Sequence, residues 1–285
     1  MRQTDMNREI LDRKLEAWTR NATGNLENFK SIGKDIGAIE GVARGKPVLI
    51  LGPGPSLDLI APYLGHCTKG DVVCFACNTA LNPLAARGFI PDLLACYDAD
   101  EAVANQVDEY VRFCPKDMLQ QVTMVCPVTI HPRVPRLWPG PVVWFRPEDP
   151  SEPCNATFHR VLRVQFPELG AIGNCSCVFL LLIRLAIWAK AEVVLSCGFD
   201  LPVNPADSYS AVRYDLSGVA PVPLLAQPRV IDETIQRLHQ RYTGSLLGLI
   251  AAEGVPFVNL SPLASFKHLV RTLPPRPPAL GAKGE

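Results

Sequence analysis

The sequence lacks an excess of charge of either sign, because its 28 lysines and arginines are balanced by 28 aspartates and glutamates. Proteins that bind nucleic acids attract the phosphate backbone with clustered lysine and arginine, so this balance gives no reason to expect a nucleic-acid partner. Nearly half of the 285 residues are apolar, which is enough to bury a large core. We therefore expect a folded protein that binds small molecules.

The sequence also lacks a long uninterrupted apolar run. The longest one, residues 175–189, is interrupted by Arg184 and is too short to cross a bilayer. The N-terminal residues are polar and charged, without the apolar segment of an export signal. We therefore expect a cytoplasmic protein without a membrane span, in which the ten cysteines remain thiols.

Paired cysteines in loops, the usual sign of a zinc site, are missing as well. Cys74 and Cys77 have the spacing of a zinc knuckle, and Cys175 and Cys177 would supply two more ligands. Both pairs nevertheless lie in apolar segments, where free cysteine behaves as a small buried hydrophobic residue. The sequence favours buried thiols over zinc.

The chain is organised around the turn Gly52-Pro53-Gly54-Pro55-Ser56. Four aliphatic residues precede it, Val48–Leu51, and predict a strand buried on both faces in a parallel sheet. Gly52 and Gly54 would let a ligand approach the main chain, and Pro55 suits the first turn of a helix. Free amides at a helix N-terminus predict a phosphate site formed by Gly52, Gly54, Pro55 and Ser56.

This turn matches neither of two familiar phosphate-binding fingerprints. Leu57 stands where the Rossmann fingerprint requires a third glycine, and no lysine follows as it does in a Walker A loop. A tight turn between a strand and a helix, without a ligand, is the alternative interpretation. The turn alone therefore indicates no chemistry.

Strand and helix patterns alternate along most of the chain. Further strands are expected over 71–77, 93–97, 122–126, 142–145, 192–197 and 256–260. This alternation predicts an α/β fold, a doubly wound, mostly parallel Rossmann-like sheet with helices on both faces.

The pattern also divides the chain into three parts. We predict an N-terminal helical extension over 1–42 with two helices, a Rossmann-like nucleotide-binding domain over 43–268, and a disordered proline-rich tail over 269–285. Within the domain, the loop over 202–228 has the length of a lid or substrate loop, and a helix is expected over 230–252. The proline-crowded stretch over 127–153 is locally basic, which suits either an anionic substrate or a solvated connection.

Ligands of doubly wound sheets bind at the carboxyl ends of the strands. Gly52, Asn78, Asp98 and Asp200 each follow an expected strand. We therefore predict that these four residues surround one cleft.

The order of these landmarks resembles the 6-hydroxymethylpterin diphosphokinase MptE-like family, over most of residues 25–265. The landmarks are the turn at 52–56, Asn78-Thr79-Ala80, Ile90-Pro91-Asp92 leading to Asp98, Gly198-Phe199-Asp200-Leu201, and the closing segment 254–261. The same domain occurs in motility accessory factors that glycosylate flagellin, and it is similar to bacterial sialyltransferases that use a cytidine nucleotide sugar. One fold therefore offers two chemistries.

The resemblance implies a nucleotide whose phosphates rest on the loop at 52–56. In the first hypothesis the protein is a transferase that passes the terminal diphosphate of ATP to a hydroxyl of a small acceptor. Asp98 and Asp200 would be catalytic and, with Asp100, would hold Mg²⁺ between the phosphate oxygens. The alternative for each aspartate is a turn or cap residue at a strand end.

In the second hypothesis the protein is a glycosyltransferase that uses a nucleotide sugar. Asn78 would bind the nucleotide, and Gly173 and Ser176 would contact it at a second glycine-marked helix start. Tyr209 or His239 would assist the leaving phosphate. Turn, cap and surface roles are the alternatives for these residues.

In a third hypothesis the chain is a non-catalytic nucleotide-binding module. The chain departs from the motility factors at two places, because Phe199 replaces a common glutamine and no histidine closely follows Asp200. The missing histidine leaves this hypothesis open. The expected partners are a nucleotide and a small acceptor, and homo-oligomerisation is left open.

Overall fold

The computed structural model describes residues 3–65, 70–148, 156–173, 175, 177–200, 213–217, 222–224, 248 and 253–261. The tail at 269–285, nearly all of the expected helix over 230–252 and most of the loop over 202–228 lie outside these residues. Ser176, Tyr209 and His239 also lie outside them.

Nine parallel strands form the central sheet. They are β1 (Lys34–Asp35), β2 (Pro47–Leu51), β3 (Val73–Cys77), β4 (Leu93–Ala95), β5 (Thr123–Pro127), β6 (Val142–Glu148), β7 (Ala171–Gly173), β8 (Val193–Cys197) and β11 (Phe257–Asn259). Their order is β1-β6-β5-β4-β3-β2-β8-β11, and β7 pairs with the C-terminal part of β6. The chain is an α/β protein with a mostly parallel sheet, as predicted.

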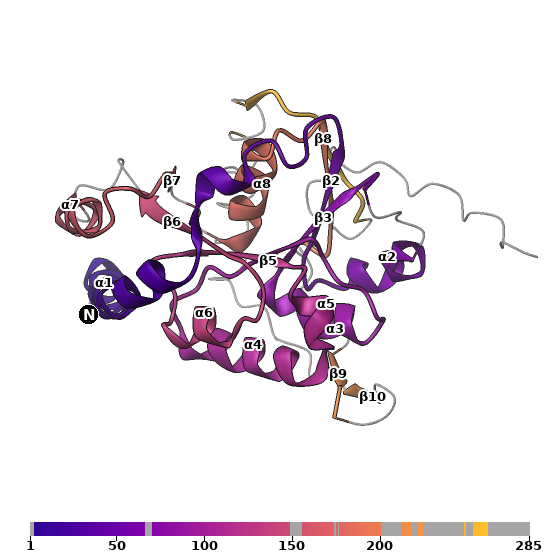
Figure 1. The fold of residues 1–285 in the computed structure, drawn as a ribbon, viewed down its shortest axis with the longest axis horizontal. Helices are drawn as coiled ribbons and strands as arrows, with labels where there is room; N and C mark the ends of the chain where they lie inside the picture. The colour runs from indigo at the N-terminus through magenta and orange to yellow at the C-terminus, as the bar shows by residue number, and fades with distance from the viewer. Residues whose placement is uncertain are drawn as a thin grey trace, which may run out of the picture.

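Helices cover both faces of this sheet. They are α1 (Gln3–Ser31), α2 (Ser56–Leu64), α3 (Leu81–Ala85), α4 (Glu101–Phe113), α5 (Lys116–Leu119), α6 (Arg133–Leu137), α7 (Ala156–Gln165) and α8 (Val178–Trp188), with short 3-10 helices η1 (Ile36–Ile39) and η2 (Asn78–Ala80). Figure 1 shows α8 on one face and α3, α4 and α6 on the other. α8 is apolar nearly all round, as a helix buried in a core must be.

The central strand and the helix after the glycine-proline turn agree with the prediction. Val48–Leu51 are almost fully buried in β2, which lies between β3 and β8. Helix α2 begins at Ser56, one residue after Pro55. The turn therefore lies at the carboxyl end of a central strand.

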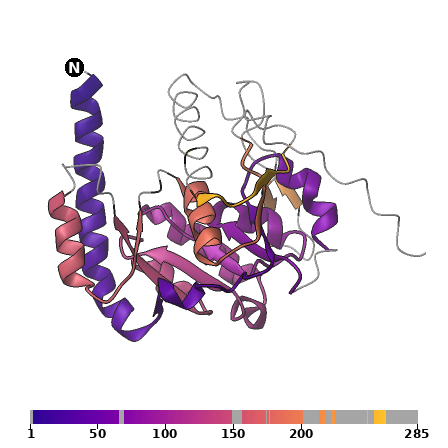
Figure 2. The same cartoon turned by 90° about the horizontal axis from the view of Figure 1, so that it is seen from above.

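The N-terminal segment differs from its prediction. Two helices were expected there, but a single helix, α1, runs to Ser31, and residues 34–35 form β1 beside β6. Figure 2 shows α1 side by side with α7, and the rings of Trp18 and Phe158 lie 5.9 Å apart between them. Helix α1 therefore contacts α7, and β1 adds a strand to the central sheet. The division of the chain into an extension, a domain and a tail stays a prediction.

The proline-crowded stretch over 127–148 is also more regular than its sequence suggests. It contains the end of β5, helix α6 and strand β6. Pro127 ends β5 and Pro141 immediately precedes β6, so both lie where the missing N–H disturbs the sheet least. Helix α7 and strand β7 follow and were not predicted.

The eight cysteines that the structure describes are free thiols. Burial raises the pKa of Cys77 and Cys177, and it raises the pKa of Cys175 to about 12. Among the described residues, no three or more His, Cys, Asp or Glu side chains gather into a metal-binding group. The burial of these cysteines agrees with the expectation of buried thiols.

None of the helices in the described part of the chain has the length and apolarity needed to cross a bilayer.

Candidate active site

Four adjacent strands bring the predicted residues to one edge of the sheet. In the order β4-β3-β2-β8, their carboxyl ends are followed by Asp98, Asn78, Gly52 and Asp200 respectively. All four strands are parallel, so these residues lie along the same edge. The edge is therefore the candidate active site.

The main-chain amides of the glycine-proline turn already have protein partners. Gly52 donates to the carbonyl oxygen of Cys197 at 2.8 Å, and Gly54 donates to that of Gly198 at 2.7 Å. The two prolines of the turn have no N–H. The amides of both glycines are therefore hydrogen-bonded within the protein.

The glycines are needed because two loops touch at this point. A Cβ atom on Gly52 would lie 2.5 Å from the carbonyl oxygen of Gly198, and one on Gly54 would lie 2.6 Å from the same oxygen. Gly198 itself has a φ of +76°, and a Cβ there would overlap the carbonyl group of Gly52. Close contact between main chains thus accounts for these glycines without a ligand.

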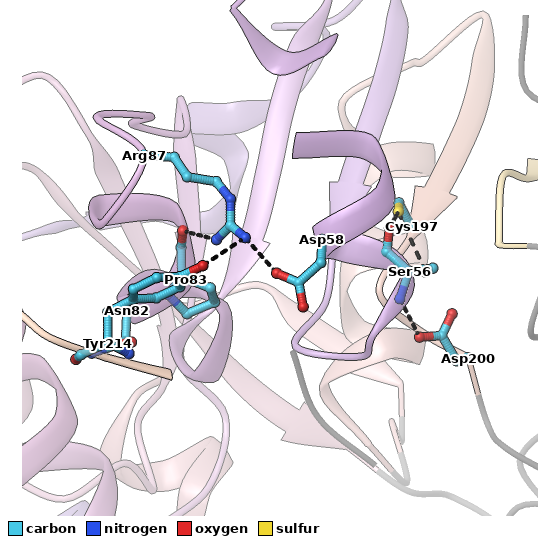
Figure 3. Close-up of polar contacts among 8 residues, drawn as sticks. All are labelled: Ser56, Asp58, Asn82, Pro83, Arg87, Cys197, Asp200 and Tyr214. Atoms are coloured by element: carbon cyan, nitrogen blue, oxygen red, sulfur yellow. Dashed lines mark hydrogen bonds and ion pairs between the residues drawn. The ribbon is translucent and has the colours of Figure 1, made fainter. Parts of the chain in front are cut away.

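Asp200 occupies the N-terminus of α2. Its Oδ2 accepts the Ser56 N–H at 2.8 Å, and its Oδ1 accepts the hydroxyl of Ser261 in a short hydrogen bond. Ser56 Oγ in turn accepts the Gly198 N–H at 2.8 Å. Figure 3 shows the carboxylate of Asp200 directed at the first turn of the helix.

This arrangement places a negative charge where the prediction placed a phosphate. A carboxylate at a helix N-terminus satisfies a main-chain donor and is favoured by the helix dipole. Asp200 is only 2% exposed, so no bulk solvent competes for it. The phosphate-binding role of Gly52, Gly54, Pro55 and Ser56 stays a prediction, and it requires Asp200 to leave the helix end.

The residues after β3 and β4 are in different surroundings. The side-chain amide of Asn78 is nearly buried and donates to Oε1 of Gln106 in α4 at 2.6 Å. Asp100 is the N-cap of α4, where its Oδ1 accepts the Ala102 N–H at 2.8 Å. Asp98 is exposed at the end of the loop from β4.

The strand order bears on the proposed metal. Asp98 follows β4 and Asp200 follows β8, three strand spacings or about 14 Å away. Carboxylates that share one Mg²⁺ each lie about 2 Å from it. A metal shared by Asp98 and Asp200 stays a prediction, and the strand order weighs against it.

Comparison with protein families now identifies the chain. The 6-hydroxymethylpterin diphosphokinase MptE-like family matches residues 20–204. The chain belongs to this family. That membership confirms the resemblance found in the sequence and supports a transferase-like function.

A search of solved structures found the MAf glycosyltransferase from Magnetospirillum magneticum AMB-1. The TM-score is 0.51 at 19% sequence identity, over 79% of this chain and 35% of that one. The chain thus spans about a third of the length of that protein, and the likeness concerns the fold. No curated protein matches the chain.

A second set of contacts at the site of this MptE-like chain was not predicted. Asn82, at the start of α3, donates to the carbonyl oxygen of Tyr214 at 2.8 Å and accepts the Tyr214 N–H at 2.7 Å. The guanidinium of Arg87 forms an ion pair with Asp58 of α2 and lies 5.2 Å from the centre of the Tyr214 ring. These contacts appear on the other side of α2 from Asp200 in Figure 3.

Through these contacts a distant segment is fixed at the same edge of the MptE-like fold. Tyr214 lies in β9 (Arg213–Asp215), which pairs with β10 (Val222–Leu224) in a separate antiparallel sheet. Both strands come from the loop over 202–228 that was predicted to be a lid or a substrate loop. Asparagine at a helix start signals only a cap, so no local pattern connects Asn82 with a residue 132 positions away.

The remaining predicted residues lie further from this group. Gly173 ends β7, which pairs with β6, and β6 itself lies four strand spacings from β2. The guanidinium of Arg184 packs against Gly173. Of the basic residues in the proline-crowded stretch, Arg133 pairs with Glu101 at 3.0 Å and Arg136 donates to Asn28 at 2.7 Å.

A cavity of about 290 Å³ lies at the amino end of β6 rather than at the candidate site. Its lining includes Gly33, Lys34, Arg136 and Trp138. Because none of the predicted site residues contributes to it, we do not assign the nucleotide to this cavity.

Proposed function

We propose that this MptE-like chain is a nucleotide-dependent transferase that passes the terminal diphosphate of ATP to a hydroxyl of a small acceptor. The observation that carries the proposal is the alignment of four parallel strand ends in a chain whose family is named for a diphosphokinase. Carboxyl ends of adjacent parallel strands are where doubly wound proteins bind nucleotides.

In this reaction the acceptor oxygen forms a bond to the β-phosphorus of ATP. The bond between that phosphorus and the oxygen bridging to the α-phosphate breaks, and AMP leaves with the electron pair. The acceptor proton passes to a base. Catalysis of such transfers consists mainly of positioning and charge neutralisation, which strand-end residues can supply.

Asp98 and Asp100 are the carboxylates best suited to Mg²⁺. Mg²⁺ in kinase sites is held by one or two carboxylates together with substrate phosphates and water. Asp98 is exposed, and Asp100 commits one oxygen to Ala102, so the pair fits that need. When bound, the ion would neutralise charge on the phosphates.

Asn78 and Asp200 take different parts in this proposal. Asn78, between the other strand ends, would hydrogen-bond the nucleotide. Asp200 would orient the first turn of α2 through Ser56 and would become catalytic only by leaving it.

The second candidate is a glycosyltransferase that uses a nucleotide sugar. The shared fold with the MAf glycosyltransferase favours it. Both candidates release a nucleotide, since ATP that loses its diphosphate yields AMP and a CMP-sugar yields CMP. The same strand-end site therefore serves either chemistry.

Thermal-shift measurements distinguish the candidates. ATP, GTP, a CMP-sugar and a UDP-sugar are each added with and without Mg²⁺, to the wild type and to Asp98→Asn. A ligand at a hundred times its dissociation constant stabilises the folded state by about 2.7 kcal/mol.

Stabilisation by ATP that requires both Mg²⁺ and Asp98 supports the diphosphokinase. Stabilisation by the CMP-sugar without Mg²⁺ supports the glycosyltransferase. Binding of a nucleotide without turnover of any donor indicates the non-catalytic module. Absence of binding by every nucleotide contradicts the proposed function.

A further inference from the structure

Three buried asparagines form one face of α1. Asn21, Asn25 and Asn28 follow one another at spacings of four and three residues, and each is at most 4% exposed. Side chains at these spacings lie on the same side of a helix. A helix that packs on a domain usually buries apolar side chains there, so this polar face needs its own explanation.

The asparagines bind main-chain carbonyls of loops at the carboxyl edge of the sheet. Asn25 donates to the carbonyl oxygens of Val128 and Ile130 at 2.9 and 2.7 Å, in the loop after β5. Asn28 donates to that of Pro132 at 3.1 Å. Helix α1 thus supplies hydrogen-bond donors to main-chain carbonyls of the segment that follows β5.

Asn21 connects this loop with the loop that carries Asp98. One of its N–H groups donates to the carbonyl oxygen of Ala99 at 3.0 Å, and the other donates to that of Thr129 at 3.1 Å. Ala99 lies between Asp98 and Asp100. Both donors of the side chain are therefore used to join the ends of β4 and β5.

We infer that Asn21 is a positioning residue of the candidate active site, which fixes the Asp98–Asp100 turn through the Ala99 carbonyl. The inference rests on the proposed function in one respect, namely that Asp98 would bind ATP through Mg²⁺. Asp98 is exposed, so its side chain depends on the main chain beneath it for its direction. The hydrogen bond from Asn21 to the Ala99 carbonyl restricts that main chain directly. A small displacement of a reacting or metal-binding group lowers the reaction rate considerably.

Asn21→Leu tests the inference, and Asn28→Leu is its matched control. Both variants remove buried amide donors from the same face of α1, but Asn28 lies about two helical turns from Asn21 and contacts Asn25, Pro132 and Arg136. Hydrogen exchange is followed at Ala102 and Val103, whose N–H groups donate to Asp100 and close the turn. We expect exchange to be about tenfold faster in Asn21→Leu and unchanged in Asn28→Leu.

A second measurement connects the turn with ligand binding. The affinity for ATP with Mg²⁺ should fall about tenfold in Asn21→Leu and stay unchanged in Asn28→Leu. If Asn21→Leu does not fold, Asn21→Ser replaces it, because a hydroxyl can donate to only one of the two carbonyls. The same expectations then apply to Asn21→Ser.

Equal exchange rates at Ala102 and Val103 in the two variants would overturn the inference, because α1 would then only stabilise the fold. This result does not depend on the nucleotide. If the wild type binds no nucleotide, the proposed function fails, while the exchange rates still decide whether Asn21 positions the turn.

Discussion

The two halves of the candidate edge are built differently. The loops after β2, β8 and β11 bind one another through Ser56, Asp200 and Ser261, and their polar groups are buried. The loops after β4 and β5 are held from outside by the asparagines of α1, and Asp98 faces solvent. The first half is closed by its own contacts, whereas the second leaves a carboxylate accessible.

This difference shows that a phosphate-loop pattern can be satisfied inside the protein. The glycine-proline turn has its glycines because the main chains of two loops touch, and its amides donate to those neighbours. The accessible half has no such pattern in its sequence. We therefore expect substitutions in the closed half to affect stability and those in the accessible half to affect ligand binding.

The largest loss of stability is expected from Gly198→Ala. The new Cβ would overlap the Gly52 carbonyl group at a positive φ, so the closed half must open. We expect the free energy of unfolding to fall by about 3 kcal/mol or more, measured by urea denaturation. Gly88→Ala is the matched control, since Gly88 has a φ of +65° with no atom within 4 Å of the new Cβ, and it should cost about 1–2 kcal/mol. Equal losses in the two variants would contradict the close contact.

Asp200→Ala should have the next largest effect. It removes the cap of α2 and leaves the buried Ser56 N–H and Ser261 hydroxyl without their acceptor, at a cost of about 2–3 kcal/mol. Asp100→Ala removes an exposed cap from α4 and should cost about 1 kcal/mol.

Asp200→Ala also tests the prediction that the turn at 52–56 binds phosphate. If the end of α2 can hold a phosphate, inorganic phosphate should raise the melting temperature of Asp200→Ala more than that of Asp100→Ala or the wild type. Equal responses in all three proteins would remove the anion site from the turn.

Asn82→Ala tests the middle of the edge, where β9 is fastened to α3. Loss of both hydrogen bonds to Tyr214 should speed hydrogen exchange at the Tyr214 N–H about tenfold and cost about 1 kcal/mol. Asn82→Asp keeps the acceptor for that N–H and should give an intermediate rate. If both variants exchange like the wild type, β9 is held by other contacts.

Asp98→Asn should change stability least, by less than about 0.5 kcal/mol, because the side chain is exposed. We expect nucleotide binding without Mg²⁺ to persist and Mg²⁺-dependent turnover to disappear, as measured by calorimetry and by AMP release. Full turnover in Asp98→Asn would place the metal elsewhere.

Local patterns in the sequence determined much of the fold. The apolar run before Gly52 identified β2, Pro55 indicated the start of α2, and the alternation of strand and helix patterns indicated the α/β class. These features depend on neighbours within a few residues, so the sequence displays them directly.

Only the tertiary structure decided which groups meet at the site. Asp200 caps a helix 144 residues earlier in the chain, and Asn21 reaches a carbonyl 108 residues later. The two-residue strand β1 exists because β6 offers it an edge. The sequence does not show which distant group a polar side chain will hydrogen-bond, because that partner depends on how the helices and strands pack.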